Sequence, residues 1–198
     1  MKTYHGEFLT RPELEALGVT CGGDDVRVHV STVIINPEGL RIGNHVRVDP
    51  FCLVSATGKI NLGDHIHIAS HCSLIGGGGI ELEDFTGVSH GARLFSAADD
   101  MVGSHMTGPT VPNEFRLVHS ALIKVKRHAV VGTGAVVFPG VTIGEGAIVG
   151  ALSFVREDVP DWSVWAGVPA KRISTRKQDV LALEALLASG ASQPRKIE

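Results

Sequence analysis

Aliphatic residues recur at every sixth position through most of this chain, and consecutive groups of three are offset by 20 residues until residue 94. A helix would need apolar residues at spacings of three and four, and a half-buried strand would need strict alternation, so neither explains a period of six. The pattern instead predicts short parallel strands on three flat faces, in coils about 4.8 Å apart. The fifteen positions are Ile42, Val48, Val54, Leu62, Ile68, Leu74, Leu82, Val88, Leu94, Val125, Val131, Val137, Ile143, Val149 and Val155.

Small or apolar residues dominate the positions four after these, which we expect to fill the narrow interior. With 24 glycines and only ten aromatic residues, the composition suits a cross-section that cannot hold large rings. Cys52 and Cys72 belong to this inward set, and the three cysteines are an odd number without close pairing, so we expect reduced thiols. The inward set is Val46, Cys52, Ile66, Cys72, Ala92, Ala129, Ala135, Val141, Ala147 and Ser153.

The charge balance excludes several partners. Eighteen basic and 21 acidic residues give a net charge of −3, so no basic field exists to hold a nucleic-acid backbone. No apolar run approaches the roughly 18 residues of a membrane span, and the first residues carry charges where a signal peptide needs an apolar core. We expect a soluble cytoplasmic protein.

Three segments fall outside the repeat. Between Leu94 and Val125 the chain is far longer than a corner requires, so residues 98–120 should leave the coils as a loop, and loops of that length are usually functional. Thr10 and Glu13 form a capping-box signal for a short helix that stops at Gly18. We divide the chain into an N-terminal segment (1–24), a β-helix domain (25–173) and a C-terminal helix and tail (174–198).

The C-terminal segment carries a helical pattern. Its apolar face consists of Val180, Leu183, Leu186 and Leu187, and Gly190 follows. We expect this helix to pack on a neighbouring subunit or on the end of the coils, with disorder after Ser192.

The hexads IGNHVR, LGDHIH and VGTGAV, the run VTIGEGAIVGA and the closing SVWAGVPAKRI resemble the hexapeptide-repeat acyltransferases, particularly the galactoside, maltose and bacterial surface-sugar acetyltransferases. The resemblance covers roughly residues 40–173. It implies a left-handed parallel β-helix, a homotrimer, and active sites in the clefts between subunits. It also implies transfer of an acetyl group from acetyl-coenzyme A to a hydroxyl or amino group of a saccharide or nucleotide-linked sugar, in surface-polysaccharide biosynthesis.

Two groups of residues are candidates for binding coenzyme A. Lys171 and Arg172 follow a Gly-x-Pro turn expected to stop the β-pattern, which would present two cations to phosphates, with Arg176 and Lys177 as further candidates. Their alternative role is that of solvated charges. The repeat also predicts one column of residues up a single corner: Pro50, Ser70, His90, Thr133 and Ala151. In this column, the resemblance implies that Thr133 and Ala151 contact the pantetheine arm, although both could be merely small corner residues.

The catalytic base is left open by the sequence. Transfer to a hydroxyl needs a base, and in the galactoside and maltose enzymes a histidine opens the loop after the third coil. Here the stretch LFSAADDM puts Asp99 or Asp100 at that place, where a carboxylate could be the base or orient a histidine. An amine depends less than a hydroxyl on a catalytic base, so the aspartate in place of the family's histidine favours an amino sugar as the acceptor. The histidines that remain candidates are His71, His90, His105 and His119.

Two other function classes compete with this reading. His45, His65 and His128 form an outward column interrupted by Phe85, and trimeric β-helix proteins of the γ-carbonic-anhydrase kind bind zinc through histidines. His128 lies two coils from His65, so ordinary surface or intersubunit contacts explain the column better, and we expect no metal. A β-helix scaffold without catalytic activity is the third hypothesis.

Overall fold

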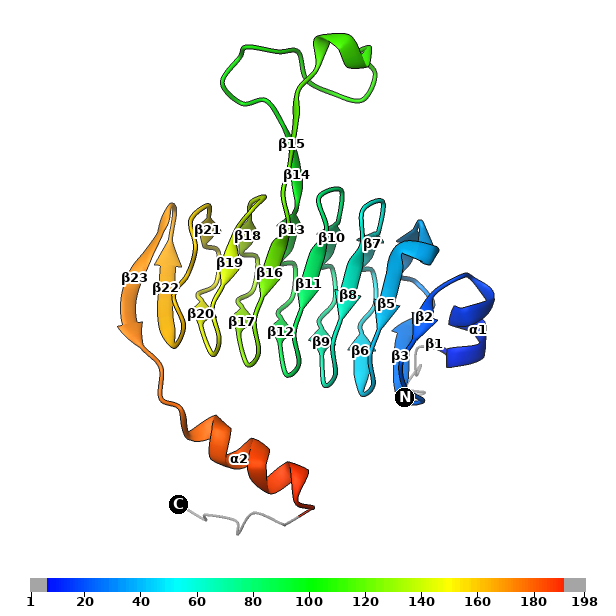
Figure 1. Ribbon diagram of the computed structural model, residues 1–198, viewed down its shortest axis with the longest axis vertical. Helices are drawn as coiled ribbons and strands as arrows, with labels where there is room; N and C mark the ends of the chain where they lie inside the picture. Colours follow the sequence, from blue (N-terminus) through cyan, green and yellow to red (C-terminus); the bar gives the residue numbers. More distant parts are fainter. Residues whose placement is uncertain (1–6, 191–198) are drawn as a thin grey trace, which may run out of the picture.

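The computed structural model describes residues 7–190, and its body is a triangular stack of coils (Figure 1). Three sheets form the faces of the prism, and their strands run parallel from coil to coil. We call these sheets face A, face B and face C. In the described range no helix is long and apolar enough to cross a membrane. The predicted parallel β-helix is confirmed.

The chain visits the faces in the order B, A, C in every coil. Face B consists of β2 (Thr20–Cys21), β5 (Leu40–Ile42), β8 (Ile60–Leu62), β11 (Ile80–Leu82), β16 (Ile123–Val125) and β19 (Thr142–Ile143). Face A consists of β3 (Val26–His29), β6 (Val46–Val48), β9 (His67–Ile68), β12 (Gly87–Val88), β17 (Val130–Val131) and β20 (Ile148–Val149), with β1 (Phe8–Leu9), β22 (Ser163–Gly167) and β23 (Ala170–Thr175) at its ends. Face C consists of β4 (Val33–Ile35), β7 (Leu53–Ser55), β10 (Ser73–Ile75), β13 (Arg93–Phe95), β18 (Val136–Val137) and β21 (Phe154–Val155).

The period of six sets the register of these sheets. On face B, Ile42 pairs with Leu62, which pairs with Leu82. The same order continues across the arm, because Leu82 pairs with Val125 and Val125 with Ile143. All fifteen predicted positions are at most 5% exposed, and the ten residues of the inward set are buried as well. The interior predicted from the sequence is therefore confirmed.

One further coil precedes those that the repeat predicts. Cys21, Val28 and Ile34 pair with the first predicted positions on faces B, A and C. Val28 lies seven positions after Cys21 instead of six. Because the period of six is broken here, the repeat does not predict this coil. Cys21 lies in this coil, and all three cysteines of the chain are free and buried.

An arm leaves the coils at the corner between faces C and B (Figure 1). Strands β14 (Ala97–Asp99) and β15 (Val118–Ser120) form its antiparallel stem, and a 3-10 turn, η2 (Asn113–Phe115), lies near its tip. The position of the predicted loop is confirmed, whereas its hairpin stem was not predicted.

Short helices flank the coils, as predicted. Helix α1 (Arg11–Ala16) begins after Thr10, whose backbone N–H donates to the Glu13 carboxylate at 2.7 Å, and Gly18 ends it with a φ of 102°. Helix α2 (Asp179–Ala188) lies beside the coils rather than on their end (Figure 1). The predicted disorder after Ser192 lies outside the described residues.

Candidate functional site

The corner between faces A and C is built from one continuous column of residues. In each coil, the residue after the column residue donates its backbone N–H to the carbonyl oxygen of the column residue in the preceding coil. These hydrogen bonds join Gly91 to Ser70 at 3.0 Å, Gly134 to His90 at 2.9 Å and Leu152 to Thr133 at 2.8 Å. The Ser70 hydroxyl also lies 2.9 Å from Nδ1 of His90. The predicted column of Pro50, Ser70, His90, Thr133 and Ala151 is therefore present in the fold.

This column presents unused backbone donors to solvent. Within residues 7–190, the amides of His90, Thr133 and Ala151 donate no hydrogen bond, and all three residues are exposed. Glycines precede the last two, and a Cβ added to Gly132 would lie 2.5 Å from the carbonyl oxygen of Val149. The corner thus consists of closely stacked backbone with outward N–H groups, which suits a carbonyl-rich chain such as pantetheine.

The predicted phosphate contacts Lys171 and Arg172 lie on a strand. The turn at Gly167 does not stop the β-pattern, because β23 folds back antiparallel on β22 and extends face A. This hairpin lies beyond the last coil at the same corner, since Gly150 donates to the Trp165 carbonyl at 2.7 Å. Lys171 and Arg172 are exposed there, and Lys171 lies 3.6 Å from Glu157.

Arg176, a further candidate for phosphate, is engaged elsewhere. Its guanidinium donates to the carbonyl oxygens of His128 at 2.7 Å and Gly146 at 3.1 Å. These bonds tie the segment before α2 to the corner between faces B and A, which gives Arg176 a structural role.

Asp99 lies in the stem of the arm with both oxygens occupied. Arg116 donates to Oδ1 at 2.9 Å, and the amide of Gly108 donates to Oδ2 at 3.0 Å. The hydrogen bond from Arg116, followed by that from Gly108, lowers the pKa of Asp99 below its ordinary value. Asp99 is therefore an oriented carboxylate rather than an acid.

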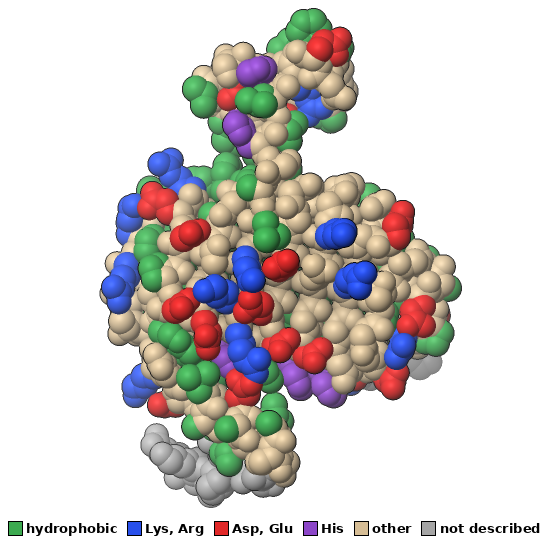
Figure 2. All heavy atoms as spheres, viewed as in Figure 1, with side chains coloured by type: hydrophobic (Ala, Val, Ile, Leu, Met, Phe, Trp, Pro, Cys, Tyr) green, Lys and Arg blue, Asp and Glu red, His purple; other side chains and the backbone are tan. Residues whose placement is uncertain are grey.

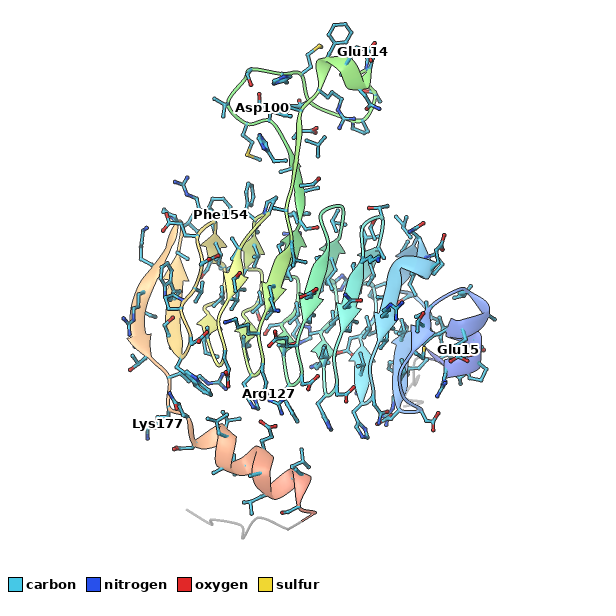
Figure 3. The ribbon with its side chains drawn as sticks, viewed as in Figure 1. Glu15, Asp100, Glu114, Arg127, Phe154 and Lys177 are labelled. Atoms are coloured by element: carbon cyan, nitrogen blue, oxygen red, sulfur yellow. The ribbon has the colours of Figure 1, made fainter. Side chains whose placement is uncertain are left out.

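Asp100, the alternative at that place, organises the arm instead. Its buried carboxylate accepts the amides of Val102, Ser104 and His105 at 2.7–2.8 Å and the Ser104 hydroxyl at 2.6 Å. These hydrogen bonds, that of the Ser104 hydroxyl foremost, lower the pKa of Asp100. Figure 3 shows its place in the arm.

The structure separates the predicted catalytic residues into two groups. His105 lies in the arm and His119 in its stem, both exposed, whereas His90 lies on the corner between faces A and C. The arm starts from the other edge of face C. Among the described residues, no hydrogen bond or ion pair joins the arm to His90, Thr133 or Ala151. A single chain therefore does not assemble the predicted site.

The histidine column forms a stack of rings. His45 stacks on His65 at a centroid distance of 4.6 Å, His65 on Phe85 at 4.6 Å and Phe85 on His128 at 5.1 Å. His128 is buried, with Nε2 2.6 Å from a carboxylate oxygen of Glu184 in α2. Residues 7–190 contain no group of three or more His, Cys, Asp or Glu side chains placed to hold a metal ion. Histidines gather along the lower edge of the coils and in the arm (Figure 2).

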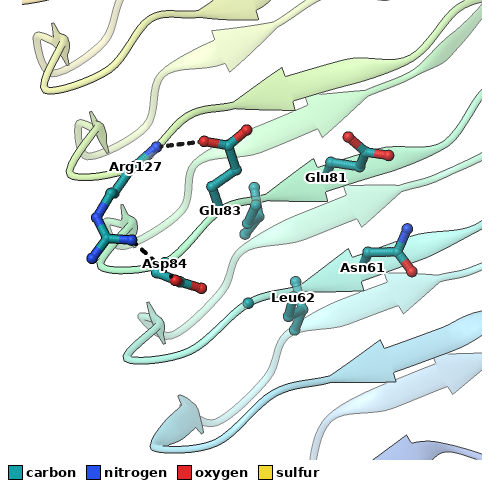
Figure 4. Close-up of a pocket in the computed structure, with 8 residues that line it drawn as sticks. Asn61, Leu62, Glu81, Glu83, Asp84 and Arg127 are labelled. Atoms are coloured by element: carbon teal, nitrogen blue, oxygen red, sulfur yellow. Dashed lines mark hydrogen bonds and ion pairs between the residues drawn. The ribbon is translucent and has the colours of Figure 1, made fainter. Parts of the chain in front are cut away.

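The hollows of the single chain lie away from both groups. One of about 460 Å³ on face B is lined by Asn61, Glu81, Glu83 and Asp84, and Arg127 closes it with an ion pair of 3.3 Å to Asp84 (Figure 4). A shallow hollow of about 450 Å³ on face A is lined by a different set of polar residues: His45, Arg47, Asp49, His65 and His67. His45 and His65 belong to the histidine column seen in the sequence, whereas Arg47, Asp49 and His67 were not predicted, although the offset of 20 between Arg47 and His67 was a usable signal.

Comparison with known proteins gives close relatives along the whole chain. No family model matches the sequence. The chain is 35% identical over 185 residues to dTDP-4-amino-4,6-dideoxy-D-glucose acyltransferase of Escherichia coli, covering 93% of this chain and 96% of that protein.

Solved structures of AntD, an N-acyltransferase from Bacillus cereus, superimpose closely. A complex with dTDP-4-amino-4,6-dideoxyglucose and coenzyme A gives a TM-score of 0.91 at 36% identity, covering 94% of this chain and 100% of that one. A complex with dTDP and 3-hydroxybutyryl-CoA gives 0.90 at 37% identity, covering 94% and 98%. Several AntD crystals contain variants of a serine or of an aspartate ten residues after it.

Proposed function

Because the chain belongs to the hexapeptide-repeat sugar acyltransferases, we propose that it transfers an acyl group from a coenzyme A thioester to the amino group of a nucleotide-linked dideoxy sugar. The membership confirms the prediction of an acyltransferase that uses coenzyme A, and it decides against a zinc hydrase and against a scaffold without catalysis. The amine acceptor, the acetyl group, the trimer and the site residues are parts of the proposal. A cytoplasmic location and a role in surface-polysaccharide biosynthesis stay predictions.

The proposal of an amine acceptor rests on the state of the Asp99 carboxylate. The galactoside and maltose enzymes have a histidine where this chain has an ionised carboxylate held by Arg116 and Gly108. A carboxylate with a lowered pKa is a poor base, but it accepts a hydrogen bond from an amine N–H and so orients the nucleophile. Ser89 and Asp99 also have the spacing of the serine and aspartate varied in AntD, and they are the only such pair in this sequence.

The chemistry needs few groups from the protein. The neutral amine attacks the thioester carbonyl carbon, a C–N bond forms, the C–S bond breaks, and the thiolate leaves. The proton lost by the nitrogen ends on the thiolate, which releases coenzyme A as a thiol. The free amides of His90, Thr133 and Ala151 line the corner where the developing oxyanion would accept hydrogen bonds.

A trimer would bring the two groups of residues together. The outward residues of face C are mainly apolar, although Ser55, Ser73 and Arg93 interrupt them: Val33, Ile35, Leu53, Ile75, Phe95, Val136 and Phe154. Val33 is 56% exposed and Ile35 46% exposed, which favours burial against other copies. Face B instead presents Arg41, Glu81 and Lys124 to solvent.

Three prisms with face C toward a common axis meet edge to edge. The corner between faces A and C of one copy then lies beside the corner between faces C and B of the next, where the arm begins. We propose that His90, Thr133 and Ala151 of one subunit face Asp99, His105 and His119 of its neighbour. Lys171 and Arg172, at the end of the same corner, would meet the phosphates of coenzyme A.

A thiol-release assay tests the acceptor. We expect thiol release from acetyl-CoA or 3-hydroxybutyryl-CoA with dTDP-4-amino-4,6-dideoxyglucose, and release at least about a hundredfold slower with the corresponding 4-hydroxy sugar. Equal rates, or transfer to the hydroxyl sugar alone, would overturn the amine assignment.

Three of the four candidate histidines provide an internal control in this assay. Since a neutral amine needs no base, His90→Ala, His105→Ala and His119→Ala should each reduce the rate by less than about tenfold. A much larger loss at one of them, at saturating substrates, would identify that histidine as the base.

A further inference from the structure

Three basic residues form an in-register ladder on face A. Arg27 in β3 pairs with Arg47 in β6, and Arg47 pairs with His67 in β9. All three side chains point outward on strands about 4.8 Å apart. Arg27 and Arg47 are side chains of like charge on adjacent strands, and such a pair does not stabilise a sheet.

The central part of this ladder is held in a fixed geometry. The Asp49 carboxylate, whose side chain is only 11% exposed, accepts Nε of Arg47 at 2.7 Å and Nε2 of His67 at 2.8 Å. The guanidinium of Arg47 also lies 5.5 Å from the centre of the Phe8 ring. Burial opposes the ionisation of Asp49, but the hydrogen bonds from His67 and Arg47 outweigh it and lower the pKa of this group. Asp49 therefore stays charged and keeps both partners oriented.

Several donor groups of the ladder are not used by Asp49. Among the described residues, neither terminal nitrogen of Arg47 nor Nδ1 of His67 has a hydrogen-bond partner. Both side chains are about half exposed. An arginine oriented through Nε, with its terminal nitrogens free, is suited to an anion with several oxygens.

The outward residues of face A change character along the coils. After His67 the same column continues through Gly87, Val130, Ile148 and Val164. This outward column of face A is thus basic over the first coils and apolar over the last ones. Thr133 and Ala151, the proposed pantetheine contacts, adjoin the apolar end, so the basic end is left for a different ligand.

We propose that Arg47 and His67, supported by Arg27, bind the diphosphate of the nucleotide-linked acceptor. This inference rests on the proposed function and names the subsite that the acceptor uses. A Cβ added to Gly87 would approach nothing closer than 3.9 Å, so no side chain of the described residues covers the position beyond His67, where the sugar would lie. A sugar seated there would extend toward Ser89, and the two substrates would approach the transfer point from opposite ends of one wall.

Substitutions in the ladder test the subsite kinetically. We expect Arg47→Gln and His67→Gln each to raise the KM for dTDP-4-amino-4,6-dideoxyglucose about tenfold to a hundredfold, because each removes a charge-assisted hydrogen bond. The KM for acetyl-CoA should not change. Lys126→Ala is the matched control, since Lys126 is a surface cation paired with Asp161 at 3.6 Å and lies off the ladder.

Direct binding separates failure of the subsite from failure of the proposed function. Inorganic pyrophosphate and dTDP should bind the wild type in calorimetry and bind both ladder variants at least about tenfold more weakly. A wild type that acylates no nucleotide-linked amino sugar would overturn the proposed function. A wild type that does, with ladder variants of unchanged KM and unchanged pyrophosphate affinity, would overturn the subsite alone. If Arg47→Gln lowers the melting temperature, His67→Gln, which alters an exposed ring, decides the question.

Discussion

The corners of the coils are turned by single residues in the left-handed conformation. His45, His65, Phe85 and His128 have φ between 54° and 60°, and each costs about 1–2 kcal/mol relative to glycine. Their rings stack on one another along the corner, which offsets part of that cost. The column of histidines that suggested a zinc site in the sequence is thus explained by stacking.

Asp99 allows a prediction about pH. Hydrogen bonds from Arg116 and Gly108 lower the pKa of Asp99, so this carboxylate stays ionised around neutral pH and contributes no titration there. The kcat/KM for the amino sugar should therefore rise between about pH 6 and pH 9 with deprotonation of the acceptor amine alone. Asp99→Asn should lower kcat/KM about tenfold to a hundredfold at every pH without moving the inflection.

The matched control for Asp99 is Glu114→Gln, an exposed carboxylate elsewhere in the arm (Figure 3). It should leave the pH profile unchanged in height and position. An inflection that disappears in Asp99→Asn would instead make Asp99 the general base.

At the scale of elements, one buried carboxylate orders the first turn of the arm. Asp100 accepts four hydrogen bonds within residues 102–105, and its pKa is lowered, so this support is present at neutral pH and is lost only as pH falls through the lowered pKa. Asp100→Asn replaces one acceptor oxygen by an NH2 group facing backbone donors. We expect trypsin to cleave after Arg116 at least about tenfold faster in this variant.

The β-helix should not respond to the same substitution. Within residues 7–190 the stem strands β14 and β15 pair with each other and not with the strands of the coils, so the thermal midpoint of the coils in Asp100→Asn should stay at the wild-type value while acyl transfer falls. Glu114→Gln again serves as the control for protease sensitivity. An unchanged cleavage rate in Asp100→Asn would show that the apolar contacts of the arm hold it together without this carboxylate.

The elements differ in how far the sequence predicts them. The period of six yields the register of the coils and the column from Pro50 to Ala151, because each coil repeats one local geometry. It misses the coil that begins at Cys21, where the spacing is irregular, and the strand β23 that carries Lys171, because antiparallel pairing depends on contacts with β22. Arg47 and His67 follow the offset of 20, but this spacing does not show that the buried Asp49 binds and orients both side chains.

At the scale of the whole molecule, the three faces have different chemistry. Face C is mainly apolar, face B is charged, and face A grades from basic to apolar. With face C at the centre of a trimer, face A of one copy and face B of the next form the walls of each outer groove. The predicted catalytic and coenzyme residues then occupy the bottom of that groove, contributed by two subunits.

Mixing two inactive variants tests this arrangement. Thr133→Arg places a long side chain at an exposed position of the corner and should block the coenzyme, whereas Asp99→Ala removes the carboxylate supplied by the arm. If corner and arm belong to different subunits, trimers assembled from both variants contain some sites with two intact halves, and random assembly restores about a quarter of the wild-type activity. If both halves came from one chain, no mixed trimer would contain an intact site. A co-expressed mixture no more active than its better parent, with sedimentation showing trimers throughout, would therefore contradict the shared site.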